Sequence, residues 1–354
     1  MRSGHILVVS FRVVPSPLDD AAASKQEVVF VRRSRETIQY KRPPPTPSHH
    51  GTAGGRLLTV ESQASLEESE KPGVRENKLN ELSGTEWIKF TKSWFVHRPK
   101  PRGDQKIRHP ASFPESLVRE FVLFFTKKGQ LVVDPFLGTG STLVASLEAD
   151  RAGVGFEIVD KYAEISRKRV AEVLNEKRGR VTLTGEKATW AEVIHGNSKE
   201  LSSIWGARGF PPADYCITSP PYWSQLKRNH IRQKDRVEKG LDTVYSTDPE
   251  DIGNVDDYHE FLREMKVIFN EVHKVMKPNG YLTVITNNVF FEGKMYPLAF
   301  DTVSTLSQGP YGWTPKDERI WLQDDKSLLP LGVFNAWVGN RHHQYCLIFR
   351  KESS

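Results

Sequence analysis

The sequence contains little cysteine and no long hydrophobic run. Only two cysteines, Cys216 and Cys346, occur among its 354 residues, and each lies within an apolar stretch typical of a strand. This count excludes a disulfide framework and a cysteine-rich metal site, and it predicts reduced, buried thiols in an intracellular protein. No apolar run approaches the roughly 20 residues that a membrane-spanning helix requires, so no membrane association is expected. His342 and His343 have no spaced partner, and we predict no metal site.

The chain is mildly basic, with a formal net charge of +6. This charge suits an anionic partner, although the sum alone decides little. Residues 1–78 contain basic, proline-rich and glycine-rich stretches that cannot bury much apolar surface, and we predict that they form a disordered N-terminal extension. A basic arm that contacts nucleic acid and a translation start further downstream are the alternatives. Residues 79–354 are long enough to form one sizeable folded domain.

Strand and helix patterns alternate from residue 131 onward. Helices are predicted over residues 160–178 and 256–276, and Pro114 begins an earlier helix. Residues 277–280, with the sequence Lys-Pro-Asn-Gly, are predicted to stop the second of these helices and turn into the next strand. The alternation predicts an α/β fold, with a largely parallel sheet and helices on both faces. The predicted strands cover residues 131–136, 153–158, 192–196, 213–218, 281–287, 319–322 and 344–350.

A glycine-rich turn follows the first predicted strand. It runs from Asp134 through Gly138 and Gly140 into a helical pattern that Ser141 or Thr142 is expected to cap. Glycines at these positions let the backbone approach a ligand closely, although such a turn is also typical of a tight connection without a ligand. Glu157 ends the next predicted strand, 23 residues after Asp134, and an acid at about this spacing suits ribose hydroxyls.

A second motif leaves the predicted strand at 213–218. Ser219 offers a neutral side-chain oxygen, and Pro220 offers a carbonyl whose direction is restricted by the two consecutive prolines Pro220 and Pro221. Two such acceptors can hold the amino group of a nucleobase, while the ring of Tyr222 can stack on an extruded base for about 1–3 kcal/mol. The alternative is a Pro-Pro turn with Tyr222 and Trp223 simply buried. Both motifs leave strands at the carboxyl edge of the predicted sheet, so we expect them to lie together.

Together these motifs resemble the amino-methylating DNA methyltransferases, which use S-adenosylmethionine to methylate cytosine-N4 or adenine-N6. The segment from Arg108 to Pro114 resembles the cofactor-binding segment that precedes the family's glycine turn. The Ser-Pro-Pro-Tyr form at Ser219, as opposed to Asp-Pro-Pro-Tyr, favours cytosine-N4. Asn197 stands where many relatives carry an acid near the adenine ring. The resemblance implies a Rossmann-like seven-stranded sheet with an antiparallel last strand, and it implies cofactor contacts from His109, Phe113, Asp134, Pro135, Phe136, Gly138, Gly140, Glu157 and Asn197.

The resemblance also implies a mechanism and partners. Ser219, Pro220, Pro221 and Tyr222 would hold the flipped base for direct, in-line methyl transfer, with no covalent base adduct and no dedicated proton acceptor. The absence of a Pro-Cys nucleophile agrees with this. Adenine-N6 methylation, RNA guanine-N2 methylation and a catalytically idle nucleic-acid-binding scaffold are the alternatives. The expected partners are double-stranded DNA and a cognate restriction endonuclease, in the cytoplasm of a prokaryotic or viral system, while the oligomeric state is not predicted.

A basic insertion covers residues 224–255, directly after the Ser-Pro-Pro-Tyr motif. We predict that it forms a target-recognition loop, and the alternative is a surface loop whose charges are merely solvated. Later in the chain, within or just after residues 324–340, Trp337 and Arg341 could reach bases, or they could pack within the core or a loop. The insertion's predicted nucleic-acid contacts are Lys227, Arg228, Arg232, Lys234 and Arg236.

Overall fold

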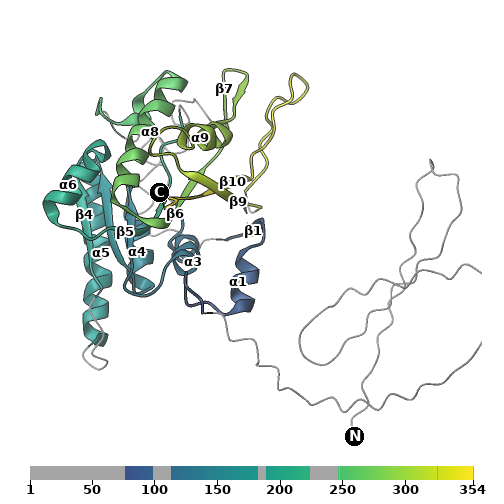
Figure 1. Cartoon of the computed structure of the whole chain (residues 1–354). Coiled ribbons are helices and arrows are strands. Elements are labelled where there is room, and N and C mark those ends of the chain that lie inside the picture. The colour runs from purple at the N-terminus through teal and green to yellow at the C-terminus, as the bar shows by residue number, and fades with distance from the viewer. Residues whose placement is uncertain are drawn as a thin grey trace, which may run out of the picture. The chain divides into compact units, whose positions relative to one another are not determined.

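The computed structural model describes residues 76–98, 113–181, 189–223, 246, 248–324 and 326–353. Within these residues the fold is Rossmann-like α/β, and one eight-stranded sheet has the strand order β1-β9-β10-β6-β5-β2-β3-β4 (Figure 1). A separate hairpin consists of β7 and β8. The strands are β1 Trp94–Val96, β2 Leu131–Asp134, β3 Ala152–Glu157, β4 Ala191–His195, β5 Ala213–Thr218, β6 Met276–Thr286, β7 Val289–Phe291, β8 Lys294–Tyr296, β9 Thr314–Leu322 and β10 His343–Arg350.

The sheet is parallel from β6 to β4, whereas β10 runs antiparallel between β6 and β9. The predicted antiparallel last strand is therefore confirmed, but the predicted total of seven strands is wrong. The additional strand, β1, pairs in parallel with β9, with Trp94 opposite Ile320. β1 has only three residues, and none of them is buried. Such a short, unburied segment shows no hydrophobic periodicity in the sequence. β1 is a strand only because β9 supplies its hydrogen-bonding partner.

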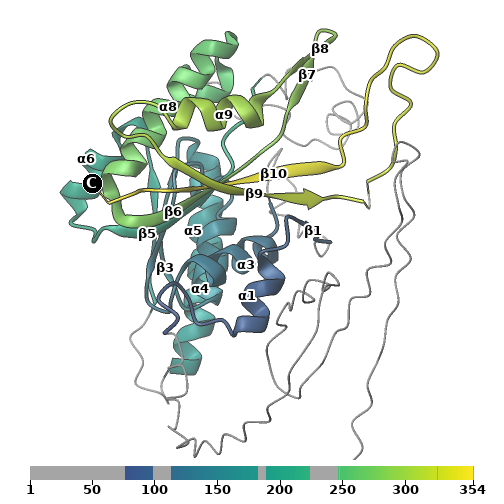
Figure 2. The same cartoon turned by 45° about the vertical axis from the view of Figure 1, so that its right-hand side comes forward.

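Helices cover both faces of the sheet, as predicted (Figure 2). One face carries α1, α3, α4 and α5, and the other carries α6, α8 and α9. None of the helices in the described part of the chain combines the length and apolarity needed to cross a membrane. The helices are α1 Gly84–Phe90, α3 Glu115–Phe125, α4 Ser141–Glu148, α5 Asp160–Val181, α6 Leu201–Arg208, α8 Tyr258–Val275 and α9 Leu298–Leu306, with short 3₁₀ turns η1 Ser198–Glu200 and η2 Ile252–Asn254.

Burial on both faces explains the continuous apolar runs of the central strands. In β2, Val132 packs on the α3 side, while Leu131 and Val133 pack on the α8 side. Both cysteines are buried in this core and neither forms a disulfide. In α3 the apolar residues at helical spacing are all buried, namely Leu117, Phe121, Phe124 and Phe125.

The start of β6 differs from the prediction. Helix α8 stops at Val275 as expected, but β6 begins at Met276 instead of residue 281. Asn279 has a left-handed backbone, with φ of 66°, and its N–H donates to the Lys351 carbonyl at 2.7 Å. The Lys-Pro-Asn-Gly sequence thus forms an irregularity inside the strand, because its backbone still finds partners on neighbouring segments.

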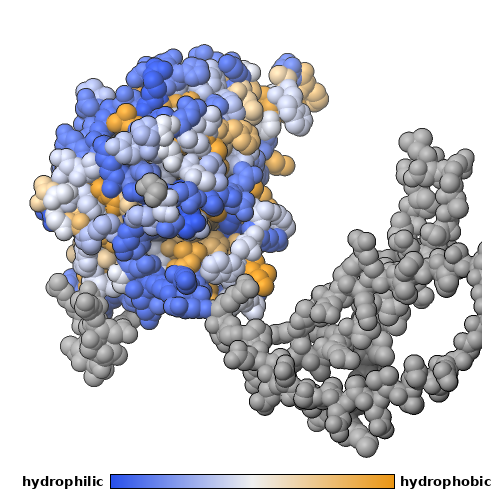
Figure 3. Space-filling view, viewed as in Figure 1, coloured by the Kyte–Doolittle hydropathy of each residue, from blue (hydrophilic) through white to orange (hydrophobic). Residues whose placement is uncertain are grey.

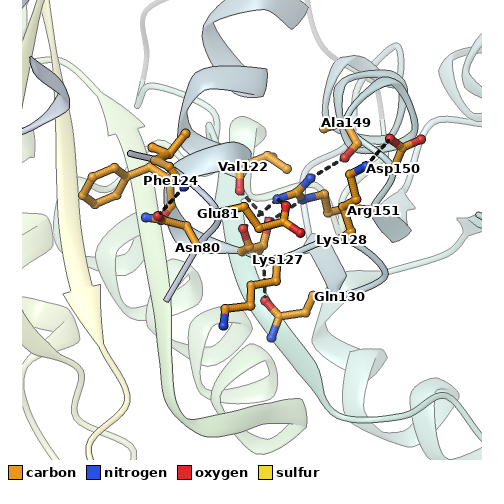
Figure 4. Close-up of polar contacts among 12 residues, drawn as sticks. Asn80, Glu81, Val122, Phe124, Lys127, Lys128, Gln130, Ala149, Asp150 and Arg151 are labelled. Atoms are coloured by element: carbon orange, nitrogen blue, oxygen red, sulfur yellow. Dashed lines mark hydrogen bonds and ion pairs between the residues drawn. The ribbon is translucent and has the colours of Figure 1, made fainter. Parts of the chain in front are cut away.

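A buried arginine holds the start of the described domain at the amino end of β3 (Figure 4). The Arg151 guanidinium donates to Thr126, to the Ala149 carbonyl and, at 3.0 Å, to the Glu81 carboxylate. The Asn80 side chain is buried nearby and donates to the Phe124 carbonyl at 2.7 Å. These contacts tie residues 80–81 to the core. The predicted disordered extension, residues 1–78, lies almost entirely outside the described residues and stays a prediction.

Candidate active site

Asp134 lies at the carboxyl end of β2 and is completely buried. One carboxylate oxygen accepts hydrogen bonds from the Thr218 hydroxyl at 2.5 Å and the Phe136 N–H at 2.9 Å. The other oxygen accepts from the Thr142 hydroxyl at 2.5 Å. Burial raises the pKa of Asp134 to about 6, while these three donors favour the charged form and limit the rise. Asp134 thereby joins the ends of two neighbouring strands to the first turn of α4.

The glycine turn after Asp134 requires two left-handed residues. Gly138 and Gly140 have φ of 55° and 86°, a conformation that side chains disfavour. A β-carbon on Gly140 would also lie 3.1 Å from Ser166, on α5. The turn therefore packs tightly against α5 at the start of α4.

The predicted cap of α4 is wrong. The N-cap residue is Gly140, and no side chain caps the helix. The Thr142 hydroxyl is directed to Asp134 instead, because the buried carboxylate needs donors. The hydroxyls of Ser141 and Thr139 are buried and, within the described structure, have no hydrogen-bond partner.

Glu157 ends β3 beside this turn, as predicted. Its two carboxylate oxygens accept separate backbone hydrogen bonds, from Gly138 N–H at 2.7 Å and Val159 N–H at 2.9 Å. Burial raises the pKa of Glu157 to about 8, against the effect of these two donors, and the nearby acids Asp251 and Asp134 raise it further. An acid is therefore held at the position that the spacing predicted for ribose hydroxyls.

The end of β4 completes this side of the site. The Asn197 side chain caps η1 by accepting from Lys199 N–H at 3.0 Å, and its amide donates to Glu250 at 3.3 Å. The Ser198 hydroxyl donates to the Pro135 carbonyl and fixes the β4 connection against the glycine turn. Asn197 thus lies on a loop in contact with the turn, although its own amide is used for local capping.

The Ser-Pro-Pro-Tyr motif leaves β5 at the same edge of the sheet. Ser219, Pro221 and Tyr222 are partly buried, and Pro220 is buried. The Ser219 hydroxyl donates to the Tyr222 hydroxyl at 3.3 Å, and Tyr222 donates in turn to the Gln344 side-chain oxygen at 2.8 Å. Burial raises the pKa of Tyr222 well above its ordinary value, so the phenol remains a neutral donor. Gln344 belongs to β10, so this chain of hydrogen bonds joins the motif to the antiparallel strand.

Trp223 anchors the motif in the core. It is buried, and its indole N–H donates to the Asp256 carbonyl at 2.9 Å. Its ring packs against three other aromatic rings, those of Tyr258, Phe291 and Tyr296. Trp223 is therefore simply buried, as the alternative interpretation of the motif predicted. Tyr222 differs, because its hydroxyl takes part in a polar network.

The remaining predicted residues are distributed as follows. Phe136 is partly buried, with its ring centroid 6.2 Å from that of Phe269. Phe113 packs against the core on the α3 side of the sheet. Beyond the described residues lie His109 and the five basic side chains of the insertion, which are Lys227, Arg228, Arg232, Lys234 and Arg236.

Four side chains of this site were not predicted to act there. Thr218 and Thr142 hold Asp134, and Gln344 holds Tyr222. Asp251 is buried at the N-cap of η2, close enough to raise the pKa of Glu157. The signals in the sequence were the positions of Thr142, just after the glycine turn, and of Thr218, at a strand end next to the Ser-Pro-Pro-Tyr motif. The contacts of Gln344 and Asp251 depend on the order of strands in the sheet.

Residues 20–168 and 213–354 match the model of a DNA methylase family. The chain is 34% identical over 102 residues to the Type II methyltransferase M.BglI of Bacillus subtilis. The matched region covers 28% of this chain and 28% of that protein. It is 34% identical over 89 residues to the Type II methyltransferase M.MjaI of Methanocaldococcus jannaschii, covering 25% of this chain and 29% of that protein. The matched region thus spans less than a third of the length of these relatives.

Solved structures are similar at lower identity. TrmN from Thermus thermophilus is 13% identical, with a TM-score of 0.40, over 68% of this chain and 50% of that one. Another Thermus thermophilus protein, solved in complex with S-adenosyl-L-methionine, is 21% identical with a TM-score of 0.29, over 45% of this chain and 52% of that one.

Proposed function

We propose that this chain, which belongs to the DNA methylase family, transfers a methyl group from S-adenosylmethionine to the exocyclic N4 amine of cytosine in double-stranded DNA. The observation that carries the proposal is the link between the glycine turn and the Ser-Pro-Pro-Tyr motif. Through its hydrogen bond to Thr218, Asp134 holds the two motifs at one edge of the sheet. A cofactor on the turn and an amine in the motif would then be neighbours.

Three features at the glycine turn support the proposal that it binds S-adenosylmethionine. Glu157 is an acceptor suited to ribose hydroxyls, and the positive φ of Gly138 and Gly140 allows close approach to the backbone. The buried hydroxyls of Thr139 and Ser141 would find partners in a polar ligand seated on the turn. When bound, the cofactor supplies a methyl group made electrophilic by the positively charged sulfur that carries it.

Ser219 and Pro220 would prepare the amine for attack. The lone pair of an exocyclic amine is delocalised into the base until acceptors draw its N–H bonds out of the ring plane. Because the Ser219 proton is directed to Tyr222, the lone pairs of Ser219 remain free to accept from the amine. Among the described residues nothing donates to the Pro220 carbonyl, which can act as the second acceptor. The choice of cytosine-N4 as the target rests on the resemblance of the Ser-Pro-Pro-Tyr form to that of the cytosine-N4 methyltransferases.

Tyr222 would hold the target base outside the DNA double helix. The Tyr222 ring is only partly buried, so one face can stack on an extruded base, and stacking of this kind contributes about 1–3 kcal/mol. The amine would attack the methyl carbon in line, the bond from that carbon to sulfur would break, and the methylated nitrogen would then lose its proton to solvent. No strong base is required, so catalysis comes from positioning and from acceptors directed at charge that develops on nitrogen.

The DNA contacts and partners remain parts of the same proposal. Lys227, Arg228, Arg232, Lys234 and Arg236 would contact phosphates from the insertion after the motif. His109 and Phe113 would border the methionine end of the cofactor, and Asn197 the adenine. A cognate restriction endonuclease is proposed by likeness to the type II methyltransferases that the chain resembles.

The test combines purified protein with isotopically labelled S-adenosylmethionine and either mixed genomic DNA or total RNA. After digestion to nucleosides, mass spectrometry identifies the labelled base. We expect the label on N4-methylcytosine from DNA. Ser219→Ala should lower the rate about a hundredfold, the effect of removing one group directed at transition-state charge. Ser203→Ala, at an exposed serine of α6, is the matched control and should keep the full rate.

The other outcomes separate the alternatives. Label on N6-methyladenine would keep the mechanism and replace the base, whereas label on RNA guanine alone would exclude DNA as the substrate. Binding of S-adenosylmethionine without any label would favour an idle scaffold. A Ser219→Ala variant as active as the wild type would remove Ser219 from the mechanism.

A further inference from the structure

We propose that residues 323–342, here named the β9–β10 arm, contact the DNA duplex beside the target base and stack the aromatic rings of Trp337 and Phe334 on its bases. This inference rests on the proposed function. It adds a second DNA-binding element, distinct from the basic insertion, and it assigns an apolar role to that element.

The arm is rooted at the active-site edge of the sheet. β9 runs parallel to β6, so its end at Leu322 lies at the same edge as the ends of β2 and β5, and β10 starts there. Gln323 N–H donates to the His342 carbonyl at 2.7 Å and closes the root. Two residues later, Gln344 accepts from the Tyr222 hydroxyl. Figures 1 and 2 show the arm projecting from this root beyond the body of the domain.

The outer part of the arm has a defined conformation. The Asn340 side chain joins the two sides of the arm: it accepts from Leu329 N–H at 2.8 Å and donates to the Leu329 carbonyl at 2.9 Å. At the tip, the N–H groups of Asn335 and Ala336 both donate to the Gly332 carbonyl. Phe334 has φ of 63°, which is rare for a bulky residue and typical of functional sites. The arm therefore presents its tip in a preorganised form, which lowers the entropy cost of binding.

The tip exposes aromatic rings almost completely. Phe334 and Trp337 have relative exposures of 103% and 93%, and Leu328 has 76%. Figure 3 shows hydrophobic residues at the outer end of this projection. The alternative that Trp337 packs within the core is wrong. Large apolar groups gathered on one projecting element mark a binding surface, because their exposure to water is unfavourable.

The part of the arm beyond Asp325 carries no negative charge, although the arm as a whole has no net charge because Asp324 and Asp325 balance Lys326 and Arg341. No aspartate or glutamate occurs between Lys326 and Lys351. Asp324, at the root, forms an ion pair with Arg98 at 2.9 Å. Arg341 lies over the Phe290 ring of β7, with its guanidinium carbon 5.9 Å from the ring centroid. From Lys326 onward the arm can thus lie against phosphates without a facing row of carboxylates.

The chemistry of base flipping supplies the reason for aromatic rings at this position. Extrusion of a base leaves its neighbours without stacking partners, which costs a few kcal/mol. DNA-binding proteins fill or open such steps with apolar side chains, and an aromatic ring can stack on any base. An arm rooted beside Tyr222 is suited to this task, because Tyr222 is the residue proposed to hold the extruded base.

The experiment measures methyl transfer to genomic DNA, as intact duplex and after heat denaturation, for the full chain and its variants. On duplex, Trp337→Ala with Phe334→Ala should lower the rate about tenfold to a hundredfold, whereas Trp337→Phe should retain most activity because stacking is preserved. On single strands the defect should be much smaller, since no duplex stack is opened. Ile88→Ala, at an exposed residue of α1 (72% exposed), is the control and should match the wild type.

Each outcome has a distinct meaning. An inactive wild type on both DNA forms would defeat the proposed function, whereas an active wild type with an equally active double variant would defeat only the arm. An equal defect on both forms would overturn the stacking role. If denatured DNA is no substrate, fluorescence polarisation on a pool of labelled duplex fragments decides, and unchanged affinity in the double variant overturns the inference. A wild-type dimer that the double variant converts to monomer, measured by light scattering without DNA, would assign the rings to a second copy instead.

Discussion

Asp134 and Arg151 are two buried ionisable side chains at opposite ends of the β2–β3 strand pair, and their surroundings differ. Arg151 donates to the hydroxyl and the carbonyl of Thr126. It also donates to the Ala149 carbonyl and to Glu81, both labelled in Figure 4. Asp134 also has its donors, but the turn that follows it keeps the buried hydroxyls of Thr139 and Ser141 without partners.

The difference agrees with our proposal, in which the edge at Asp134 binds the cofactor and the edge at Arg151 is structural. Around Arg151 the network is complete, and its contacts hold the chain that enters the domain. Around Asp134 the network is partly open, and a polar ligand or an ordered water is able to complete it. Buried charge alone therefore does not identify a site. The informative signal is a buried polar group that the protein leaves unsatisfied next to a satisfied one.

The largest effect is expected at the open edge, from Gly138→Val. A β-branched residue at positive φ displaces the turn whose N–H holds Glu157, so affinity for S-adenosylmethionine should fall at least about a hundredfold. Isothermal titration calorimetry measures the affinity. Gly206→Ala, within α6 and with open space around its α-carbon, is the matched control and should bind as the wild type does. Unchanged affinity in Gly138→Val would remove the turn from the cofactor site.

Arg151→Met tests the closed edge. Removal of the guanidinium leaves the carbonyls of Thr126 and Ala149 buried without their donors, so the free energy of unfolding should fall by about 3 kcal/mol. Urea denaturation followed by circular dichroism measures this loss. The folded variant should still bind S-adenosylmethionine normally. Lys128→Met, at an exposed lysine whose ion pair with Asp150 spans 3.9 Å, should change stability by less than about 0.5 kcal/mol. A large loss of cofactor affinity in folded Arg151→Met would contradict the separation of the two edges.

The stability of the protein is also expected to depend on pH through Glu157. The pKa of Glu157 is about 8 in the folded state, above its ordinary value of 4.5, so folded Glu157 retains a proton that the unfolded chain releases. Its contribution to stability is complete below about pH 4.5 and is lost as pH rises through 8. The stability of the wild type relative to Glu157→Gln should therefore decrease between pH 5 and pH 9. Urea denaturation at pH 5, 7 and 9 measures this, and parallel pH profiles for the two proteins would show that Glu157 is already ionised at pH 5.

The local parts of the site were predictable from the sequence. The glycine turn, the acid at the end of β3 and the Ser-Pro-Pro-Tyr motif each depend on neighbouring residues, and each occupies a strand end as expected. The cap of α4 was not predictable, because the Thr142 hydroxyl was taken by Asp134, eight positions earlier in the chain. Local capping propensity was overridden by the demand of a buried carboxylate for donors.

The sequence by itself determined the α/β class, the carboxyl edge that carries both motifs and the buried faces of the main helices, since these follow from hydrophobic periodicity and short-range turns. Only the tertiary structure decided that Thr218 bonds to Asp134 across 84 positions, that Tyr222 bonds to Gln344 across 122, and that the Trp337 ring faces solvent. Such contacts depend on which strands become neighbours in the sheet. That order is set by the packing of the whole domain and leaves no periodic trace in the chain.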